Sequence, residues 1–490
     1  MRPLTAVCTF RAGTLFLPAL RRLLASEMIE EVLVVTRKQI PEVLPRCSIV
    51  DAGPLTSRAA LREVLEKIKT EYLLLLPGTI PVLPGSYTLE IMINSIQSMN
   101  AGLVYSDYYE DTGSGKLLHP LIDYQAGSVR DDFDFGHLVL FSVPRIRQAL
   151  ERYGGTPPCH HGALYDLRLK LSVDHRIHHV QEALYSIITH GQERNGMAHF
   201  SYLDPHNHEI QKEMESIFTD HLKRIGAYIP PDRLELIEEP ADSFPVKASV
   251  IIPVKNRKAT IADAVQSALA QEADFTFNII VIDNHSTDGT TGVVAGLAQK
   301  NPAVRHIIPD RHDLGIGGCW NLGINDRACG RYAVQLDSDD LYENNLVLET
   351  IVDTLRDGDF AMVVGSYTIV NENLDQIPPG LIDHREWTDT NGHNNALRIN
   401  GLGAPRAFST TLMRQMGFLN VSYGEDYAAA LSISRRYKIG RVFESLYLCR
   451  RWPGNTDAGL SIEASNKNNI FKDSLRSREI AKRQELGRNG

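Results

Sequence analysis

The stretch ASVIIPVKNRKATIADAVQSALAQEADFTFNIIVID, Ala248–Asp283, decides the fold class of this chain. It begins with a β-branched run that is typical of a buried strand. Ala259–Gln271 then places apolar residues, among them Ile261 and Val265, on one face of a helix. Asn278–Asp283 is a second apolar strand. A strand, a helix and a strand in this order predict a right-handed βαβ unit in a mostly parallel sheet with helices on both faces.

The N-terminal half repeats this alternation of strands and helices. LTAVCTF and EEVLVVT match the two strands above, with a helix-like segment between them. Further along, TEYLLLLPGT matches GRYAVQLDSDD, and GALYDLRLKLSVDHRIHHVQEALYSI matches YGEDYAAALSISRRYKIGRVFESLYL. Because the elements correspond in order, we expect a diverged duplication that produced two tandem α/β domains.

A candidate linker divides the two halves. Tyr228–Lys247 is rich in proline and acidic residues and has little apolar periodicity. We therefore expect one domain over 1–240 and a second over 241–490, which ends in a helical tail. The tail, Lys467–Arg488, is basic and helix-compatible. We expect it to pack on its own domain, and a peripheral membrane contact is the alternative.

Composition and charge narrow the class of protein. The content is 43% hydrophobic and 23% charged, as in ordinary globular proteins, and the net charge of -9 argues against a non-specific nucleic-acid binder. The six cysteines form no CxxC pair, so neither a zinc site nor a disulfide framework is indicated. The apolar run Thr14–Leu20 is too short to span a membrane. These features predict a cytoplasmic protein without a membrane helix of its own.

Two aspartates follow a predicted strand of the C-terminal half. Tyr332–Leu336 is apolar, and Asp337 and Asp339 come directly after it. Carboxylates at the carboxyl end of a strand face the crevice where α/β sheets bind ligands, and oxygen ligands suit Mg²⁺ or Mn²⁺. The alternative is a surface turn in which Asp340 caps the next helix.

Five motifs together carry a resemblance to a known family. They are VIIPVKNR at Val250–Arg257, VIDNHSTDGT at Val281–Thr290, GGCWNLGI at Gly317–Ile324, LDSDD at Leu336–Asp340 and GED at Gly424–Asp426. In order and spacing they resemble the family 2 glycosyltransferases. This resemblance implies a GT-A fold, Rossmann-like in layout, that binds a nucleotide-sugar donor and inverts the anomeric centre.

The resemblance also assigns roles to single residues. It implies that Asp339 and Asp337 bind Mn²⁺ or Mg²⁺. It also implies that Asp283 accepts a hydrogen bond from the base of the nucleotide, which suits uracil. Asp426, with Glu425 beside it, is implied to be the catalytic carboxylate. One base suffices for inversion in a single displacement. The donor-binding residues implied in this way are Pro253, Lys255, Asn256, Arg257, Asp283, Asn284, Ser286, Asp288, Asn321, Asp337 and Ser338.

The sequence departs from the family in three places. No histidine follows His393 to serve as a further metal ligand, so water, Asn455 or Asp457 would take that position. Arg451-Trp452 is similar to the QxxRW of processive synthases, but Leu448 stands in place of the glutamine. Gly315-Ile316-Gly317-Gly318 is not a dinucleotide fingerprint, because Trp320 stands where its third glycine belongs.

The N-terminal half lacks the candidate metal site. Leu76–Thr79 stands where the second half has Asp337–Asp340, and Asp166 stands opposite Asp426. We therefore expect a degenerate GT-A-like domain, similar in layout to bacterial two-domain glycosyltransferases such as chondroitin polymerase with one domain silenced. The irregularly spaced histidines of this half indicate no metal site.

The sequence thus predicts an inverting glycosyltransferase, of hexosyl or N-acetylhexosaminyl type, that transfers a sugar from a UDP-sugar to a glycan or lipid-linked acceptor. We expect acceptor contacts in Pro378–Leu397, which is a long polar segment. The alternative is that this segment forms a lid. The alternative functions are a non-catalytic nucleotide-sugar-binding scaffold and a two-domain glycan polymerase. A sugar nucleotidyltransferase is a further alternative, but it would need an N-terminal phosphate loop, which Met1–Arg22 lacks.

Overall fold

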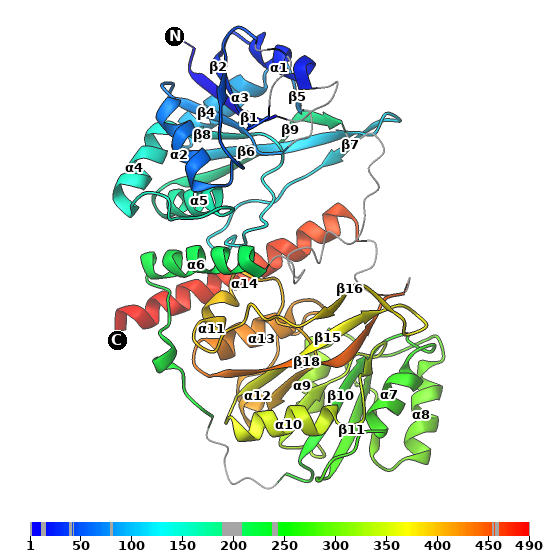
Figure 1. Ribbon diagram of the computed structural model, residues 1–490. Helices are drawn as coiled ribbons and strands as arrows, with labels where there is room; N and C mark the ends of the chain where they lie inside the picture. Colours follow the sequence, from blue (N-terminus) through cyan, green and yellow to red (C-terminus); the bar gives the residue numbers. More distant parts are fainter. Residues whose placement is uncertain are drawn as a thin grey trace. The chain divides into compact units, whose positions relative to one another are not determined.

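The computed structural model describes residues 2–10, 16–38, 42, 44–78, 82–188, 208–237, 244–452, 455 and 460–489. The chain forms two compact units, each of which can be followed by colour in Figure 1. The first unit comprises Met1–Asn195, Glu209–Ala227 and Leu460–Gly490, and the second comprises Gly196–His208 and Tyr228–Gly459. No helix in the described ranges is long and apolar enough to cross a membrane.

The first unit is built on a nine-stranded sheet with the order β3-β2-β1-β4-β8-β6-β9-β5, in which β7 pairs with β6. Its strands are β1 (Leu4–Thr9), β2 (Ile29–Val35), β3 (Cys47–Val50), β4 (Tyr72–Leu76), β5 (Val82–Pro84), β6 (Ala101–Asp111), β7 (Lys116–His119), β8 (Val139–Ser142) and β9 (Arg176–Ile188). Its helices are α1 (Phe16–Leu24), α2 (Arg58–Lys67), α3 (Thr88–Ser98), α4 (Val143–Tyr153), α5 (Ala163–Asp174), α6 (His208–Arg224) and α14 (Ile462–Asn489).

The second unit is built on a nine-stranded sheet with the order β12-β11-β10-β13-β17-β15-β18-β14, in which β16 pairs with β15. Its strands are β10 (Ala248–Val254), β11 (Phe277–Asp283), β12 (Val304–Ile307), β13 (Tyr332–Gln335), β14 (Leu341–Tyr342), β15 (Met362–Val370), β16 (Gln376–Ile382), β17 (Arg406–Ser409) and β18 (Ile439–Arg450). Its helices are η3 (Pro231–Arg233), α7 (Ile261–Leu269), α8 (Thr290–Lys300), α9 (Ile316–Asn325), α10 (Val347–Asp357), α11 (Gly392–Asn395), α12 (Thr410–Met416) and α13 (Glu425–Ser434).

The two sheets share one strand order: β1 corresponds to β10, and each later strand of the first sheet corresponds in turn to one of the second. The predicted pair of tandem α/β domains is confirmed. Each sheet is more mixed than the expected parallel one. β8 runs antiparallel between β4 and β6, and β17 does the same between β13 and β15. No helical crossover separates β6 from β8, and without such a crossover a neighbouring strand runs antiparallel.

The core of the second unit explains why β10 is apolar on both faces. Val250, Ile252 and Val254 join the cluster that contains the buried face of α7. Ile251 points the other way, where its side chain lies against Gly323 of α9. Because successive side chains of a strand face opposite sides, helices on both faces require a continuous apolar run.

The predicted linker packs largely onto the second unit. Ile229 and Leu234 are buried, Glu235 forms a parallel bridge with Tyr437, and the Ile237 amide donates to the Asp359 carbonyl. The part from residue 238 to 243 lies outside the described residues.

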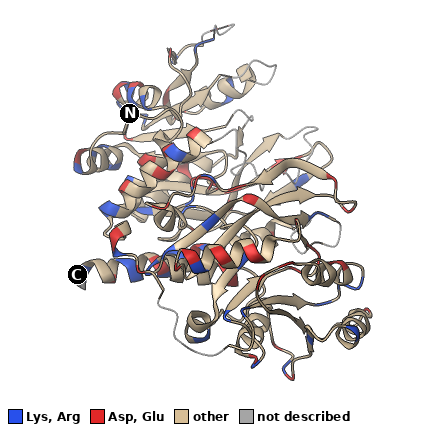
Figure 2. Cartoon of the chain, turned by 60° about the horizontal axis from the view of Figure 1, so that its bottom comes forward, with Lys and Arg blue, Asp and Glu red and all other residues tan. Residues whose placement is uncertain are grey.

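The C-terminal helix α14 belongs to the first unit, whereas the sequence suggested that it packs on the second. Leu475 and Ile480 of α14 are buried, but Ile470 is exposed. Both charge signs occur along the helix (Figure 2), and its buried face includes Asp473 and Arg476, which are fully enclosed. An apolar pattern therefore does not identify the partner of this helix.

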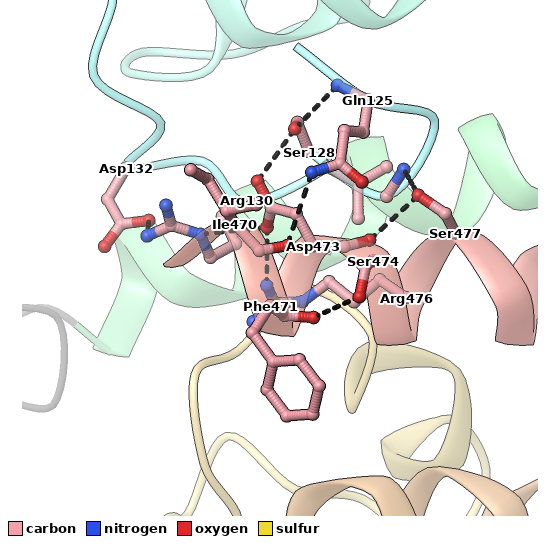
Figure 3. A network of polar contacts seen from close by, with 12 residues as sticks. Gln125, Ser128, Arg130, Asp132, Ile470, Phe471, Asp473, Ser474, Arg476 and Ser477 are labelled. Atoms are coloured by element: carbon pink, nitrogen blue, oxygen red, sulfur yellow. Dashed lines mark hydrogen bonds and ion pairs between the residues drawn. The ribbon is translucent and has the colours of Figure 1, made fainter. Parts of the chain in front are cut away.

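Hydrogen bonds to the loop after β7 hold α14 in the first unit (Figure 3). Asp473 is central: its carboxylate accepts from the Ser128 hydroxyl at 2.7 Å and from Arg476 at 2.7 Å, and lies 3.6 Å from Arg130. The Gly127 amide donates to Ser477 Oγ at 2.8 Å. A Cβ at Gly127 would collide with the α14 backbone, so this approach requires glycine.

Replacing Asp473 with alanine should destabilise the first unit by about 3 kcal/mol, because it leaves buried arginine and hydroxyl groups without their carboxylate partner. Urea denaturation followed by circular dichroism measures the change. Glu485→Ala, an exposed acidic position on the same helix, is the matched control and should shift stability by less than about 0.5 kcal/mol. Equal effects of the two substitutions would contradict the assignment of α14 to this unit.

Candidate active site

The candidate site lies at the carboxyl ends of three parallel strands of the second unit. β10 pairs in parallel with β11 on one side and with β13 on the other. The loops that follow these strands begin at Lys255, Asn284 and Leu336. Because parallel strands end at the same edge of a sheet, the motif residues of all three loops meet there.

Asp283 ends β11 and is fully buried. Its Oδ1 accepts from the Ser286 amide at 3.0 Å and its Oδ2 from the Thr291 hydroxyl at 2.6 Å, with His306 3.5 Å away. Burial alone would raise the pKa of Asp283, but the bonds from Ser286 and Thr291 outweigh it and hold the pKa below its ordinary value. Asp283 thus organises the turn that follows β11.

Asn256, Ser286 and Asp288 join the loops after β10 and β11. Asn256 adopts a φ of 55°, its amide donates to Ser286 Oγ at 3.0 Å, and its Oδ1 accepts from the Thr287 amide at 2.8 Å. Asp288 accepts from the Lys258 amide at 3.0 Å and from the Thr290 hydroxyl at 2.6 Å. The Thr290 hydroxyl bond, together with the backbone donors, lowers the pKa of Asp288 to about 2.

The remaining predicted donor-binding residues surround these loops. Pro253 is half-buried at the end of β10, and Lys255 is exposed. Asn284 donates from Nδ2 to the Leu314 carbonyl at 2.8 Å, while its buried Oδ1 has no hydrogen-bond partner among the described residues. Both ends of the Asn321 amide bond the Phe418 backbone at 2.8 Å, which ties α9 to the loop after α12.

The aspartates after β13 form a crowded acidic loop. Asp337 Oδ1 accepts from Gln335 Nε2 at 3.0 Å, and the Asp337 amide donates to the Tyr447 hydroxyl at 2.9 Å. Asp340 Oδ1 accepts from the Arg450 amide at 2.8 Å, and the Ser338 carbonyl accepts from Thr260. Burial first, and then repulsion among the aspartates, raises the pKa of Asp337 and of Asp340.

Asp339 faces the segment after β18. Its Oδ2 lies 3.3 Å from Trp452 Nε1, 3.4 Å from Asn455 Nδ2 and 3.4 Å from Arg257 Nε. Asn455, a predicted candidate for the third metal ligand, is thus close to Asp339, while Asp457 lies outside the described residues. Among the described residues no group of three or more His, Cys, Asp or Glu side chains is arranged to hold a metal ion.

Glu425 and Asp426 begin α13. Gly424 precedes them with a φ of 77°, a left-handed conformation that favours glycine. Asp426 accepts from the Tyr427 amide at 2.7 Å, and its Oδ2 lies 2.8 Å from Arg406 Nη2. Glu425 is buried, and burial together with the charge of Asp426 raises the pKa of Glu425 to about 8. Glu425 therefore keeps its proton at neutral pH.

Two further polar residues of the site carried no motif signal. Arg406 begins β17, and Gln335 ends β13, where it is buried. Arg406 Nη1 donates to Gln335 Oε1 at 3.0 Å. Gln335 could have been recognised from the sequence, because it is the amide residue in the apolar run YAVQL. A buried amide requires hydrogen-bond partners, so this position indicates a polar contact inside the sheet.

Part of the segment expected to contact the acceptor is packed against its own unit. His384 Nδ1 lies 2.8 Å from Glu386 Oε1, and His393 Nε2 lies 2.8 Å from the Ile229 carbonyl. Trp387 is buried, with Arg441 over its ring.

The first unit has no carboxylate where β4 ends: Leu76 is followed by Pro77 and Gly78, and Thr79 lies outside the described residues. Asp166, opposite Asp426, is buried and pairs with Lys170 at 2.7 Å within the same helix. This unit therefore lacks the acidic loop of the second one.

Comparison with known proteins identifies the region that contains most of the candidate site. Residues 249–419 match the model of Glycosyl transferase family 2. These residues form a family 2 glycosyltransferase domain. The match includes every predicted donor and metal residue, and it ends before Glu425 and Asp426.

The relatives of this family 2 domain are glycosyltransferases that match part of the chain. An uncharacterized glycosyltransferase of Rickettsia felis is 28% identical over 41% of this chain and 32% of its own length. A Campylobacter jejuni protein, GalNAc(5)-diNAcBac-PP-undecaprenol beta-1,3-glucosyltransferase, is 32% identical over 26% of this chain and 40% of its own. The chain therefore spans about a third of the length of the first relative.

Among solved structures, S. aureus TarS 1-349 in complex with UDP-GlcNAc matches 47% of this chain and 66% of its own, with 18% identity and a TM-score of 0.38.

Glu425→Gln should reduce the loss of stability of the second unit as the pH rises. The folded state keeps the Glu425 proton up to about pH 8, whereas the unfolded chain releases it near the ordinary value of 4.5. Folded wild-type protein therefore loses stability between these pH values, and glutamine, which does not titrate, removes this contribution.

Urea denaturation in EDTA at a series of pH values measures the effect of Glu425→Gln. The unfolding free energy of the variant should rise relative to wild type as the pH increases, and Glu372→Gln, an exposed control in the same unit, should show no such trend. Parallel curves for Glu425→Gln and wild type would show that Glu425 titrates normally.

Proposed function

We propose that the protein is an inverting glycosyltransferase that transfers a sugar from a UDP-sugar donor to an acceptor hydroxyl. The family 2 match supports the reaction class. The observation that carries the proposal is a single chain of contacts, Asp337 to Gln335 to Arg406 to Asp426, which joins the candidate metal carboxylate to the candidate base.

Asp337 and Asp339 would hold Mn²⁺ or Mg²⁺. Asp337, Asp339 and Asp340 lie close together after β13, and burial first, then the charges of Asp339 and Asp426, raise the pKa of Asp337. A divalent cation would offset both the burial and the repulsion, which supports its placement there. Oxygen ligands suit both ions, and both accept water where the protein supplies only two carboxylates. When bound, the cation supplies charge that stabilises the departing diphosphate.

The donor would lie along the loops after β10 and β11. The half-buried Pro253, the exposed Lys255 and the loop Asn256–Arg257 would contact the base and ribose. The unpartnered Oδ1 of Asn284 supports a nearby donor group, because a buried amide oxygen without a hydrogen bond is costly. Ser286 and Asp288 hold the loops that form this surface.

Asp426 would act as the base. It would accept the proton of the acceptor hydroxyl while the hydroxyl oxygen forms its bond to the anomeric carbon and the bond from that carbon to the diphosphate oxygen breaks. UDP departs with the electron pair of the broken bond. Glu425 is unsuited to this role at neutral pH, because its raised pKa keeps it protonated.

The acceptor would be a glycan or lipid-linked saccharide. The Campylobacter jejuni relative supports this class, since its name describes a glucosyltransferase for an undecaprenol-linked glycan. The first unit would be non-catalytic, because no carboxylate follows β4 among its described residues. One catalytic domain argues against a two-sugar polymerase.

Asp339→Asn should abolish metal-dependent turnover and leave the fold intact, because a neutral amide is a poor ligand for a hard cation. Release of UDP from a panel of UDP-sugars, measured by chromatography with and without manganese, tests this. Asp313→Asn, which changes an exposed acidic residue of the same domain, is the control and should remain active. Manganese-dependent turnover near the wild-type level in Asp339→Asn would refute the metal assignment.

Asp426→Asn should lower turnover by a factor on the order of 10² and leave donor affinity nearly unchanged, as expected for the loss of a general base. Calorimetric titration with the best UDP-sugar and manganese, together with initial rates, separates the two effects. Weakened UDP-sugar binding with normal turnover would instead assign Asp426 to the donor.

A further inference from the structure

Arg406 contacts both halves of the proposed active site. Its side chain is 18% exposed, and its planar guanidinium places Nη2 2.8 Å from Asp426 Oδ2 and Nη1 3.0 Å from Gln335 Oε1. A guanidinium that bonds two acceptors through two nitrogens has a restricted orientation. The position of one acceptor therefore constrains the other.

Gln335 extends this constraint to Asp337. Its Nε2 donates to Asp337 Oδ1 at 3.0 Å, so its Oε1 must face Arg406. The Gln335 side chain is buried, and its backbone carbonyl accepts from the Tyr342 hydroxyl at 3.0 Å. With both its backbone and its amide held, Gln335 is a rigid connection between Arg406 and the loop after β13.

The charges around Arg406 favour the same arrangement. Burial opposes the charge of Arg406, but Asp426, Asp337 and Glu425 raise the pKa of its guanidinium. Among the groups that face Asp426 are the cation Arg406 and the acidic side chains of Asp337 and Glu425. Arg406 offsets repulsion that would otherwise drive the carboxylates apart.

We propose that Arg406 is a positioning residue that, through Gln335, fixes the carboxylate of Asp426 relative to Asp337. This inference rests on the proposed function. An inverting displacement requires the base on the face of the sugar opposite the leaving diphosphate. A misplacement of about 1 Å can lower the rate on the order of 10²-fold. Arg406 keeps the base and the diphosphate site at a constant separation and needs no contact with the donor.

The central experiment compares Arg406→Met, Arg406→Lys and wild type in the full-length protein, with the UDP-sugar that wild type turns over fastest in manganese. Arg406→Met should lower kcat on the order of 10²-fold and change the donor dissociation constant by less than about threefold, because only the base is displaced. Arg406→Lys keeps the charge but reaches one acceptor, so its kcat should be intermediate.

A pH profile provides a second readout that a purely structural role would not move. A cation beside Asp426 favours its ionised form, so Arg406→Met should shift the acid limb of kcat to higher pH. Retained manganese-dependent UDP-sugar binding, measured by calorimetry, shows that the variant is folded.

Gln335→Met tests the connection without changing any charge. It should lower kcat on the order of tenfold, and the double variant with Arg406→Met should be no slower than Arg406→Met alone, because both changes break the same chain of contacts. Arg414→Met is the matched control: this arginine of the same unit bonds the Ile324 and Asp326 carbonyls and, among the described residues, no carboxylate, so its kcat should stay near wild type.

Several results would overturn the inference. A kcat of Arg406→Met within threefold of wild type, or no lower than that of Arg414→Met, would remove the positioning role. Loss of donor binding would make Arg406 a donor ligand, and additive effects in the double variant would separate it from Gln335. If Asp426→Asn were fully active, the proposed function itself would fail, whereas an inactive Asp426→Asn beside a normal Arg406→Met would refute only this inference.

Discussion

The register of β10 between β11 and β13 is the constraint on which the candidate site depends. Val254 pairs with Asp283, and Ile251 pairs with Gln335. Because side chains alternate along a strand, a slip of one residue would turn Asp283 and Gln335 to the opposite face of the sheet. The register is held by the apolar strand interiors packed under helices on both faces. The position of the polar loops is therefore a consequence of core packing.

Within that frame, the balance of charge shapes the site. Asp337, Asp340, Glu425 and Asp426 gather at one edge of the sheet, and burial makes the negative charge of the first three costly. Arg406 offsets part of this charge. In the first unit, the charge of the buried Asp166 is offset within its own helix, because Asp166 pairs with Lys170 one helical turn away. Two domains with one strand order thus carry loops with different charges.

The path of the chain makes the first unit depend on the end of the sequence. α14 supplies Asp473, which bonds Ser128 and Arg476 inside that unit. The first unit is therefore complete only when residues that follow the whole second unit are present. Chain order and spatial domain differ here because a charged helix packs where its buried side chains find partners.

The sequence by itself determined the two α/β domains, the strands that precede the polar loops and the family 2 motifs, since strand and helix periodicity and short motifs are local patterns. Asn256, Ser286 and Asp288 could be grouped in this way, because they lie in the loops after two neighbouring strands. The tertiary structure alone decided that Asn321 holds the Phe418 backbone, that Ser286 and Thr291 engage both oxygens of Asp283, and that α14 joins the first unit. It also decided that Arg406 meets Gln335 and Asp426. These contacts join residues that are distant in sequence or depend on the orientation of a side chain, and neither leaves a period or a motif in the sequence.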